Sequence, residues 1–466
     1  MGKVTGFLEW KRAAPHRRPI DVRLRDWNEV DQVGSDSQEQ AGRCMDCGVP
    51  FCTNGCPLGN PVPDFADAVW SGRWRDAYRQ LTTTNDFPEF TGRLCPAPCE
   101  AACVLSIDKA PVTIEYTERA ISDRAFAEGW VEVPRAAKRT GKQVAVVGSG
   151  PAGLAAAMDL ERAGHRVVVF EAAPRAGGLL RYGIPDFKIE KSVIDRRLAM
   201  LGEIEVRCNM QVGVRPTWKA LEAEFDAVVI AIGAQRARDL DVPGRNLTGV
   251  ILAMDYLTDQ NRVNGGEIDS AIYDVRGKRV VILGGGDTGS DCLGTALRQG
   301  AAEVTQIELL PAPPIGVNPE TPWPSWPVIF RTSSSQEEGG KRAFGFRTTH
   351  LEGRDGKLTT LHGIGVDRKA GALIDLPGTE LAIPVDTLIL ALGFTGPNTS
   401  ALADQLGIAL DRRGNIAVDA QFETNVRGVF CAGDAHRGAS LVVWALAEGR
   451  QLARHVNQYL AERKAA

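Results

Sequence analysis

The feature that most constrains the fold of this 466-residue chain is a unit of strand, glycine-rich loop, helix and second strand that occurs twice. The first copy has a β-branched run at 144–147, a loop at 148–153, a helix-like stretch at 154–163 and an apolar run at 167–170 that ends at Glu171. The second copy has runs at 279–283 and 303–307 around the loop 284–289, and it ends at Glu308. Two such units predict an α/β chain with parallel sheets.

Each loop reads Gly-x-Gly-x-x-Gly, which indicates a dinucleotide site only with a strand before it and a helix and an acid after it. The first glycine permits the tight turn, the second lets backbone approach a pyrophosphate, and the third lets helix and strand pack closely. Glu171 follows Gly148 by 23 residues, and Glu308 follows Gly284 by 24. We therefore expect two dinucleotides; a glycine-rich turn without a ligand is the alternative at each loop.

A distant segment indicates which dinucleotide the first unit holds. Residues 428–434 form an apolar strand ending in Gly-Asp, followed by a helical pattern at 440–460. This resembles the second FAD signature of two-dinucleotide flavoproteins; a surface turn after a core strand is the alternative. The strand ends at 228–233 and 388–393 resemble the links between FAD and nicotinamide domains, so we predict a FAD domain split by an inserted NAD(P) domain. The residues expected to bind the two cofactors are Gly148, Gly150, Pro151, Ala152, Gly153, Glu171, Gly178, Leu179, Gly233, Gly284, Gly286, Asp287, Thr288, Gly289, Glu308, Gly393, Gly433 and Asp434.

Seven of the ten cysteines lie between Cys44 and Cys103, spaced Cys-x2-Cys-x4-Cys-x3-Cys-Pro and then Cys-x3-Cys-x3-Cys. Dense cysteines in a cytosolic chain indicate metal rather than disulfides. Zinc favours paired Cys-x2-Cys knuckles, whereas a cysteine before proline is typical of cubane sites. Iron–sulfur is thus favoured over zinc or no metal. Two cubanes need eight ligands, so either one ligand is not cysteine or one cluster is incomplete. The scattered Cys208, Cys292 and Cys431 are expected to be small core residues.

Composition excludes several other classes. A net charge of −4 gives no electrostatic case for binding nucleic acid or a membrane surface. No apolar run approaches the roughly 20 residues of a membrane span, and residues 1–10 contain no apolar signal core, so we expect a cytoplasmic protein. Residues 1–140 hold short helical patterns, such as 64–81, and no convincing strand. The residues between 311 and 340, rich in Pro, Trp and Ser, read as an ordered insertion loop.

Several longer segments resemble one family. Residues 6–10, 43–52, 55–59 and 85–100 are similar to the small (β) subunit of glutamate synthase, and 177–188 resembles its FAD domain. The resemblance extends from the N-terminus to the last helix. It implies a helical domain with two 4Fe–4S clusters at 1–140, the FAD domain at 141–250 and 391–466, and the NAD(P) domain at 251–390.

The resemblance also implies the cluster ligands and the partner. One cluster would take Cys44, Cys47, Cys52 and Cys103, and the other Cys56, Cys95, Cys99 and a downstream carboxylate or amide, for which we predict Glu118; an exposed helical glutamate is the alternative. Electrons from NADH or NADPH would pass through FAD and both clusters to a large (α) subunit. That subunit would make two L-glutamates from L-glutamine and 2-oxoglutarate. A subunit of a bifurcating transhydrogenase is the second hypothesis, and a zinc-stabilised interaction module is the third.

The coenzyme and the chemistry follow from the residues near Glu308. We predict a preference for NADH, because an acid at this position suits a ribose 2′-hydroxyl and would repel a 2′-phosphate. Arg331, Arg342 and Arg347 lie downstream and are the residues that could compensate. Hydride transfer between nicotinamide and flavin relies on the cofactors, so we expect no catalytic acid or base from the protein.

Overall fold

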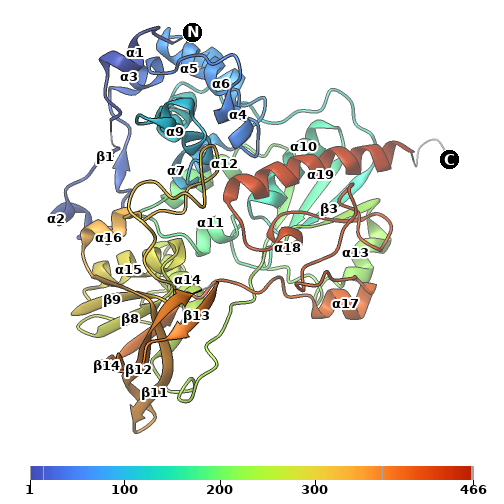
Figure 1. The fold of residues 1–466 in the computed structure, drawn as a ribbon. Coiled ribbons are helices and arrows are strands. Elements are labelled where there is room, and N and C mark those ends of the chain that lie inside the picture. The colour runs from blue at the N-terminus through green and yellow to red at the C-terminus, as the bar shows by residue number, and fades with distance from the viewer. Residues whose placement is uncertain (1, 14, 370, 463–466) are drawn as a thin grey trace.

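The structure is a computed structural model that describes every residue except 1, 14, 370 and 463–466. A small helical domain lies at the top of the view in Figure 1, and two α/β domains lie beneath it, side by side. No helix among the described residues is both long and apolar enough to cross a membrane.

The helical domain is built from short helices around one apolar core. Its elements are α1 (Gly6–Glu9), α3 (Ser37–Gly42), α4 (Phe51–Gly55), α5 (Val62–Trp70), α6 (Trp74–Leu81), α7 (Pro88–Leu94), α8 (Pro98–Ala101), η1 (Val104–Ile107) and α9 (Ile114–Ala127). The helical pattern at 64–81 is two helices rather than one, because Gly72 takes a left-handed conformation at φ +75° between them. Phe65, Leu81 and Ile121 are fully buried in the core that joins these helices.

A segment of the N-terminal region, residues 16–32, leaves the helical domain and runs down to the lower α/β domain (Figure 1). We call it the strap. It contains β1 (His16–Arg17), α2 (Ile20–Arg23) and β2 (Asp31–Gln32), and β1 pairs with β2 antiparallel. The expectation of no strand before residue 140 is therefore wrong in this detail. The two strands that pair within the strap have two residues each, and strands this short leave no periodic pattern in the sequence.

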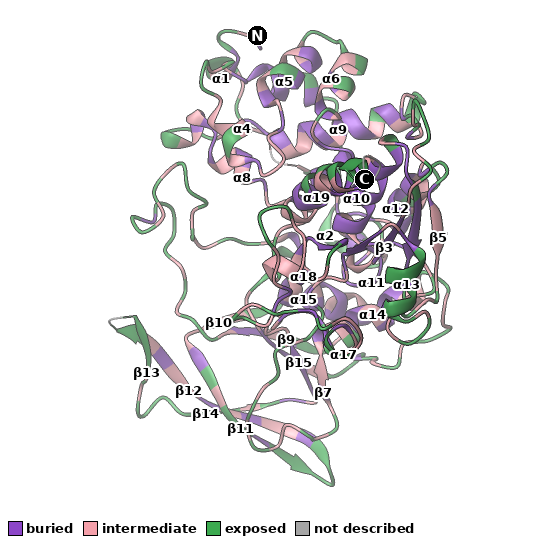
Figure 2. Ribbon diagram, turned by 90° about the vertical axis from the view of Figure 1, so that its right-hand side faces the viewer, coloured by how far each residue is buried: buried purple, intermediate pink, exposed green. Residues whose placement is uncertain are grey.

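The first sheet has the strand order β16-β6-β3-β4-β5, all parallel. Its strands are β3 (Gln143–Val147), β4 (Arg166–Phe170), β5 (Glu205–Arg207), β6 (Ala227–Ile230) and β16 (Val429–Cys431). The helices of this domain are α10 (Pro151–Arg162), α11 (Leu179–Tyr182), α12 (Lys191–Leu198), α13 (Trp218–Glu224), α17 (Ser400–Leu406), α18 (Asp434–Arg437) and α19 (Val442–Glu462). Alternate residues of β3 belong to different cores: Val144 and Val146 pack with α10 and α19, and Ala145 and Val147 pack with α13. Both faces are covered, which explains the continuous apolar runs (Figure 2).

The second sheet has the order β10-β9-β8-β15-β7, also parallel. Its elements are β7 (Val250–Leu252), α14 (Ala253–Asn264), β8 (Arg279–Leu283), α15 (Asp287–Gln299), β9 (Glu303–Glu308), α16 (Ser334–Glu338), β10 (Lys341–Phe344) and β15 (Thr387–Leu390). Helices α14 and α15 pack against one face of this sheet. Against the opposite face lies an antiparallel ribbon, which buries Leu351 and Leu361 there. Its strands are β11 (Phe346–Arg354), β12 (Lys357–Lys369), β13 (Ala372–Asp375) and β14 (Leu381–Pro384). The sequence did not predict this ribbon, whose outer part is exposed (Figure 2).

The second α/β unit is inserted into the first. The chain leaves the first sheet after β6 and returns to it at β16, and the two connections run antiparallel. The N–H of Arg236 donates to Gly396 O at 3.0 Å, the N–H of Thr395 donates to Arg236 O at 2.8 Å, and Ala237 pairs with Phe394. The predicted fold class, a helical domain followed by two Rossmann-like units of which the first is split, is confirmed.

Candidate functional site

The loop between β3 and α10 has open space at its middle glycine. Gly148 has φ +106°, and a Cβ there would lie 2.3 Å from Ala231 O. A Cβ on Gly153 would lie 2.0 Å from Gly148 O, whereas one on Gly150 would meet nothing within 4 Å. The outer glycines are thus required by packing, and the middle one faces space in which a phosphate can approach the backbone. The predicted Pro151 and Ala152 lie with Gly153 in the first turn of α10.

The loop between β8 and α15 repeats this arrangement. Gly284 has φ +125°, and its Cβ would lie 2.1 Å from Ala391 O. A Cβ on Gly289 would lie 2.1 Å from Gly284 O, and one on Gly286 would meet nothing within 4 Å. The predicted Asp287 and Thr288 begin α15. Two separate helix N-termini therefore face two open glycine loops, as phosphate-binding sites require.

The acids at the strand ends stand alike in the two units. Glu171 Oε2 accepts the Ser149 N–H at 3.2 Å and also bonds the Ser149 hydroxyl. Glu308 Oε2 accepts the Gly285 N–H at 2.6 Å. The other carboxylate oxygen accepts the N–H two residues further along in both units. Ala173 N–H donates to Glu171 Oε1 at 2.8 Å, and Leu310 N–H donates to Glu308 Oε1 at 3.0 Å. Each acid is therefore held beside its loop, where a dinucleotide presents a ribose hydroxyl.

Two distant segments converge on the first loop. Gly178 has φ +52°, and a Cβ there would lie 2.9 Å from Gly150 Cα. Gly433 has φ +71°, and its Cβ would lie 2.8 Å from the Ala152 Cβ. Both positions require glycine for close approach. The predicted Leu179 follows as the first residue of α11. Residues separated by more than 250 positions thus surround one loop.

Asp434 lies partly buried at the turn that Gly433 places against that loop. Burial raises its pKa to about 6, while the Ser440 hydroxyl, which donates to Oδ1 at 2.8 Å, favours the charged form. Glu448 of α19 fixes the turn, accepting the Gly433 N–H at 2.9 Å and Arg437 Nε at 2.6 Å. A held carboxylate at this point suits a hydroxyl-rich group such as the ribityl chain of FAD.

The predicted Gly233 and Gly393 mark the two connections between the domains. They have φ values of +71° and +81°, and a Cβ at either would meet nothing within 4 Å. The left-handed conformation therefore demands glycine here, and close packing does not.

The arginines downstream of Glu308 are held by aromatic rings. The Arg331 guanidinium lies 4.3 Å from the Trp326 ring centre, and Arg342 lies 4.4 Å from that of Phe330. Arg347 instead pairs with Asp375 on the exposed ribbon. Burial lowers the pKa of Arg331 and Arg342, but neither forms an ion pair within the described part of the chain. Both remain available to an anion.

Four of the cysteines line one pocket of the helical domain, namely Cys44, Cys47, Cys52 and Cys103. They come from α4, the turns beside it and the start of η1, and the rest of the lining is apolar. Burial, and then the neighbouring thiols, raise the pKa of Cys44 and of Cys52 to about 12. Such thiols stay neutral in water, so a bound cation is what this environment needs to hold them as thiolates.

The other three line a second pocket together with Glu118, namely Cys56, Cys95 and Cys99. Burial and the Glu118 carboxylate raise the pKa of Cys56 to about 11, and they also raise the pKa of Cys99. Val443 of α19 lines this pocket too. This pocket therefore borders the C-terminal helix, whereas every residue lining the first cysteine pocket belongs to the helical domain.

Glu118 is a buried residue of α9, not an exposed one. Asn60 Nδ2 donates to its Oε1 at 2.9 Å, and the Thr91 hydroxyl donates to its Oε2 at 3.0 Å. Burial raises its pKa to about 7. Glu115, one turn earlier, lines the same pocket, and burial raises its pKa as well. The structure thus brings two carboxylates to the pocket that is short of one cysteine.

The seven cysteines between 44 and 103 line two small cavities. Within the described residues, no group of three or more His, Cys, Asp or Glu side chains is arranged to hold one metal ion. A cubane is larger, and its ligands surround a cavity, as these cysteines do. Cys292 and Cys431 are buried in the α/β cores as expected, while Cys208 is only partly buried.

Trp323, from the loop after β9, contacts the first cysteine pocket. Its Nε1 donates to Cys103 O at 3.2 Å, and its ring centre lies 4.7 Å from that of Phe51. The insertion loop was predicted, but this contact was not, because nothing in the local pattern relates a tryptophan to a cysteine 220 residues earlier.

Comparison with known proteins matches both halves of the chain. Residues 23–130 match the family model described as dihydropyrimidine dehydrogenase domain II, 4Fe-4S cluster. Residues 142–321 and 345–449 match that of pyridine nucleotide-disulphide oxidoreductase. Among solved structures, FprA from Mycobacterium tuberculosis in complex with NADPH is similar in fold, with a TM-score of 0.56 and 20% sequence identity. The superposition covers 70% of this chain and 86% of the FprA chain. This last likeness concerns the fold.

Curated relatives match over almost the whole length. The glutamate synthase [NADPH] small chain of Mycobacterium tuberculosis is 51% identical over 465 residues, covering 98% of this chain and 95% of the relative. That of Bacillus subtilis is 44% identical and covers 99% of both chains. Glutamate synthase [NADH] of Schizosaccharomyces pombe is 42% identical over 98% of this chain, which spans 23% of that longer protein.

Proposed function

This chain belongs to the glutamate synthase small-chain family, and from that premise we propose how its sites serve as the electron-input subunit. The protein is an NAD(P)H-dependent oxidoreductase with FAD and 4Fe–4S groups. Its electrons go to a large subunit, which makes two L-glutamates from L-glutamine and 2-oxoglutarate. The observation that carries this proposal is the presence of two dinucleotide loops and two cysteine pockets in one chain.

The residues of this chain bind and orient, and the cofactors supply the redox chemistry. FAD, when bound, would supply the conversion between two-electron chemistry with a nicotinamide and one-electron chemistry with iron–sulfur clusters. The backbone N–H groups at Gly150 and Gly286 meet the pyrophosphates, with α10 and α15 pointing their N-termini at the charge. Glu171 and Glu308 bond ribose hydroxyls, and Asp434 bonds the ribityl chain. No side chain is assigned as a general acid or base.

We propose two clusters, held by the two cysteine pockets. Cys44, Cys47, Cys52 and Cys103 bind one, and Cys56, Cys95, Cys99 and Glu118 bind the other. The interleaving is supported by the shared linings, since Cys103 shares a pocket with Cys44 and not with Cys99. Because the Cys56 pocket borders α19, which follows the Asp434 turn, we assign it to the flavin side and the Cys44 pocket to the exit side.

The eighth ligand is tested by paired substitutions on α9. Glu118→Ala should lower the iron content from about eight to about seven per chain and replace one 4Fe–4S signal in the EPR spectrum by that of a three-iron cluster, because three cysteines leave one iron unligated. Glu115→Ala is the matched control, one turn away on the same pocket, and should keep both clusters. A cluster lost in Glu115→Ala but kept in Glu118→Ala would transfer the role to Glu115.

The division of labour is tested on the purified chain. Alone, it should reduce an artificial acceptor with NAD(P)H and form no glutamate. With the large subunit it should convert L-glutamine and 2-oxoglutarate to glutamate, and Cys103→Ser should abolish that step while leaving dye reduction at the flavin. Glutamate formed by the single chain would refute the assignment. Failure of the pair would favour another flavin–cluster reductase, such as the bifurcating transhydrogenases.

Two further assignments belong to this proposal. The functional units are 1–140 for the clusters, 141–250 with 391–466 for FAD, and 251–390 for the nicotinamide. The location is the cytoplasm, because all ten cysteines are free and seven serve as cluster ligands, which a reducing compartment permits.

A further inference from the structure

A large cavity lies away from both dinucleotide loops and both cysteine pockets. Its volume is about 900 Å³, within the usual range for small-molecule sites. It is bounded by α6 of the helical domain, by the linker 130–135, and by α10, α12 and α19 of the FAD domain. On α10 the lining begins at Met158, whereas the FAD loop meets the same helix at its opposite end. This cavity is therefore a separate site.

Arginine dominates the polar lining of this cavity. The charged residues are Arg75, Arg79, Arg135, Arg162, Arg197 and Arg450, against Asp86, Glu132 and Asp159. The acids Asp86 and Asp159 are already engaged, because Arg162 lies 2.8 Å from each of them and Arg450 lies 3.3 Å from Asp159. These two acids neutralise Arg162 and Arg450.

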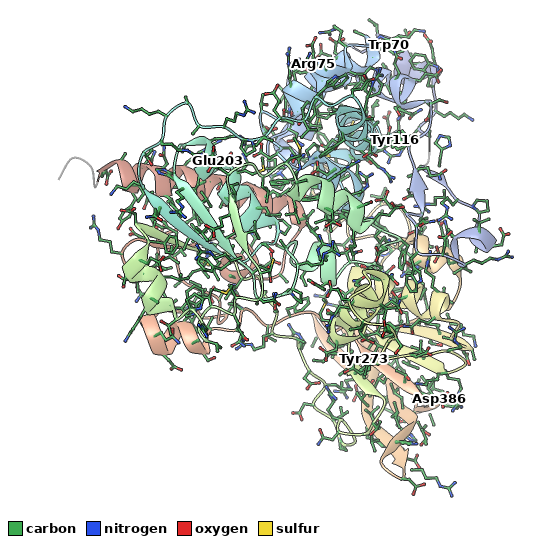
Figure 3. The ribbon with its side chains drawn as sticks, turned by 180° about the vertical axis from the view of Figure 1, so that it is seen from behind. Trp70, Arg75, Tyr116, Glu203, Tyr273 and Asp386 are labelled. Atoms are coloured by element: carbon green, nitrogen blue, oxygen red, sulfur yellow. The ribbon has the colours of Figure 1, made fainter. Side chains whose placement is uncertain are left out.

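The unbalanced charge is positive. Arg197 is paired with the buried Glu89 at 2.5 Å. Arg79 has only Asp76, at 3.8 Å on the exposed side of α6. Arg75 and Arg135 form no ion pair with any described residue, and Figure 3 labels Arg75 on the helical domain. Three exposed arginines from α6 and the linker thus line one cavity in which Glu132 is the remaining acid, an arrangement that attracts anions.

The remaining lining is apolar and aromatic. Trp130 and Tyr78 face the cavity from the linker and from α6, and Met158 and Met200 face it from the FAD domain. One donor, Nη1 of the mostly buried Arg450, has no hydrogen-bond partner. A guanidinium cluster beside rings and thioethers fits a ligand that carries carboxylate or phosphate groups on a compact apolar body.

We propose that this cavity binds a small organic anion that joins the helical domain to the FAD domain. The arginines of α6 and the linker hold the anionic groups, and Trp130 with the methionines holds the apolar part. The occupant contacts both domains, so its binding stabilises their junction. The ligand class is a small carboxylate or phosphate, and the site is independent of the coenzyme.

The test is calorimetric titration of the holoprotein at fixed ionic strength with three probes: phthalate, citrate and pyrophosphate. Phthalate combines two carboxylates with a ring, citrate lacks the ring, and pyrophosphate supplies phosphate alone. We expect phthalate to bind with a Kd at least tenfold below that of citrate if the apolar lining contributes. Comparing citrate with pyrophosphate distinguishes a carboxylate site from a phosphate site.

The variants are Arg75→Gln combined with Arg135→Gln, and Arg354→Gln combined with Arg412→Gln as a control of equal charge change on exposed surface elsewhere. The first pair should weaken binding of the tightest probe at least tenfold, and the second should leave it unchanged. NAD(P)H–dye activity should be the same in both, because neither pair touches the dinucleotide loops.

Three results would overturn the proposal. One is no binding of any probe at millimolar concentration. Another is equal weakening in both variants, which would mean unspecific attraction to a charged surface. The third is a cavity variant that binds the probes normally but associates more weakly with the large subunit, because the cavity would then receive a segment of that partner.

Discussion

A buried cluster of three charges ties the strap to the nicotinamide domain. Glu338 of α16 is fully buried; it lies 2.8 Å from Nε of Arg23 in the strap and 2.6 Å from Nη1 of Arg298 in α15. Both arginine side chains are only 1% exposed. Arg298 also lies 3.9 Å from the Phe187 ring centre and donates to the Asp26 carbonyl at 3.2 Å. Glu338 is therefore the closest carboxylate to both buried guanidinium groups, and Arg23 has a second, more distant partner in the exposed Glu337 at 3.6 Å.

We expect Glu338→Ala to release the strap. Removing one partner of a buried ion pair costs about 3–5 kcal/mol, since the opposite charge stays buried without compensation. Here Arg298 loses its carboxylate partner and Arg23 keeps only the exposed Glu337, so the upper half of that range, about 4–5 kcal/mol, is expected. Glu337→Ala is the control: that side chain is 38% exposed, and its pairs with Arg17 and Arg23 should be worth at most about 1 kcal/mol.

Hydrogen exchange of the Val30 amide measures the opening of the strap directly. That N–H donates at 3.0 Å to the carbonyl of Phe187, a residue of the FAD domain whose ring lies against Arg298 of the buried cluster, so it exchanges only when the strap opens. At about 1.4 kcal/mol per factor of ten, Glu338→Ala should speed its exchange by roughly 10³-fold or somewhat more, and Glu337→Ala by less than about tenfold. Exchange at β3 should not change in either variant. Equal acceleration in the two variants would show that the buried cluster does not hold the strap.

Three further outcomes are expected. NADH should have the higher kcat/KM, because Glu308 repels a 2′-phosphate; a preference for NADPH that Arg342→Gln abolishes would assign the 2′-phosphate to that arginine instead. Burial raises the pKa of Asp291 from its ordinary value near 4 to about 7, so the folded state binds a proton that the unfolded chain lacks between those values, and stability falls as pH rises through that window. Asp291→Asn should flatten the pH dependence of the unfolding midpoint between pH 5 and 7, and an unchanged slope would contradict this. Trp323→Ala should uncover the Cys44 pocket and speed loss of the cluster absorbance in air, and an unaltered rate would show that the ring does not shield it.

The cysteine segment shows how far local spacing reaches. The seven cysteines from Cys44 to Cys103 indicated iron–sulfur chemistry and a missing eighth ligand, since both depend on residue types, their number and short intervals. The family resemblance, and not the spacing, predicted that Cys56 is grouped with Cys95 and Cys99 rather than with the cysteines that precede it in the sequence. The two pocket linings have the same grouping. Spacing alone is silent on it, because cysteines three or four residues apart on a turn can point into different cavities.

The sequence by itself determined the two dinucleotide units and the order of the domains. Each unit is a strand, loop, helix and strand within about 30 residues, and the three glycines are required by backbone contacts that form inside that stretch. Only the tertiary structure decided the strap, the antiparallel ribbon, the Trp323 contact and the arginine cavity. Arg23 pairs with Glu338 across more than 300 residues, and Arg75 lines the same cavity as Arg450, which follows it by a still longer interval. Such contacts arise where separately formed surfaces pack, and no periodicity along the chain encodes them.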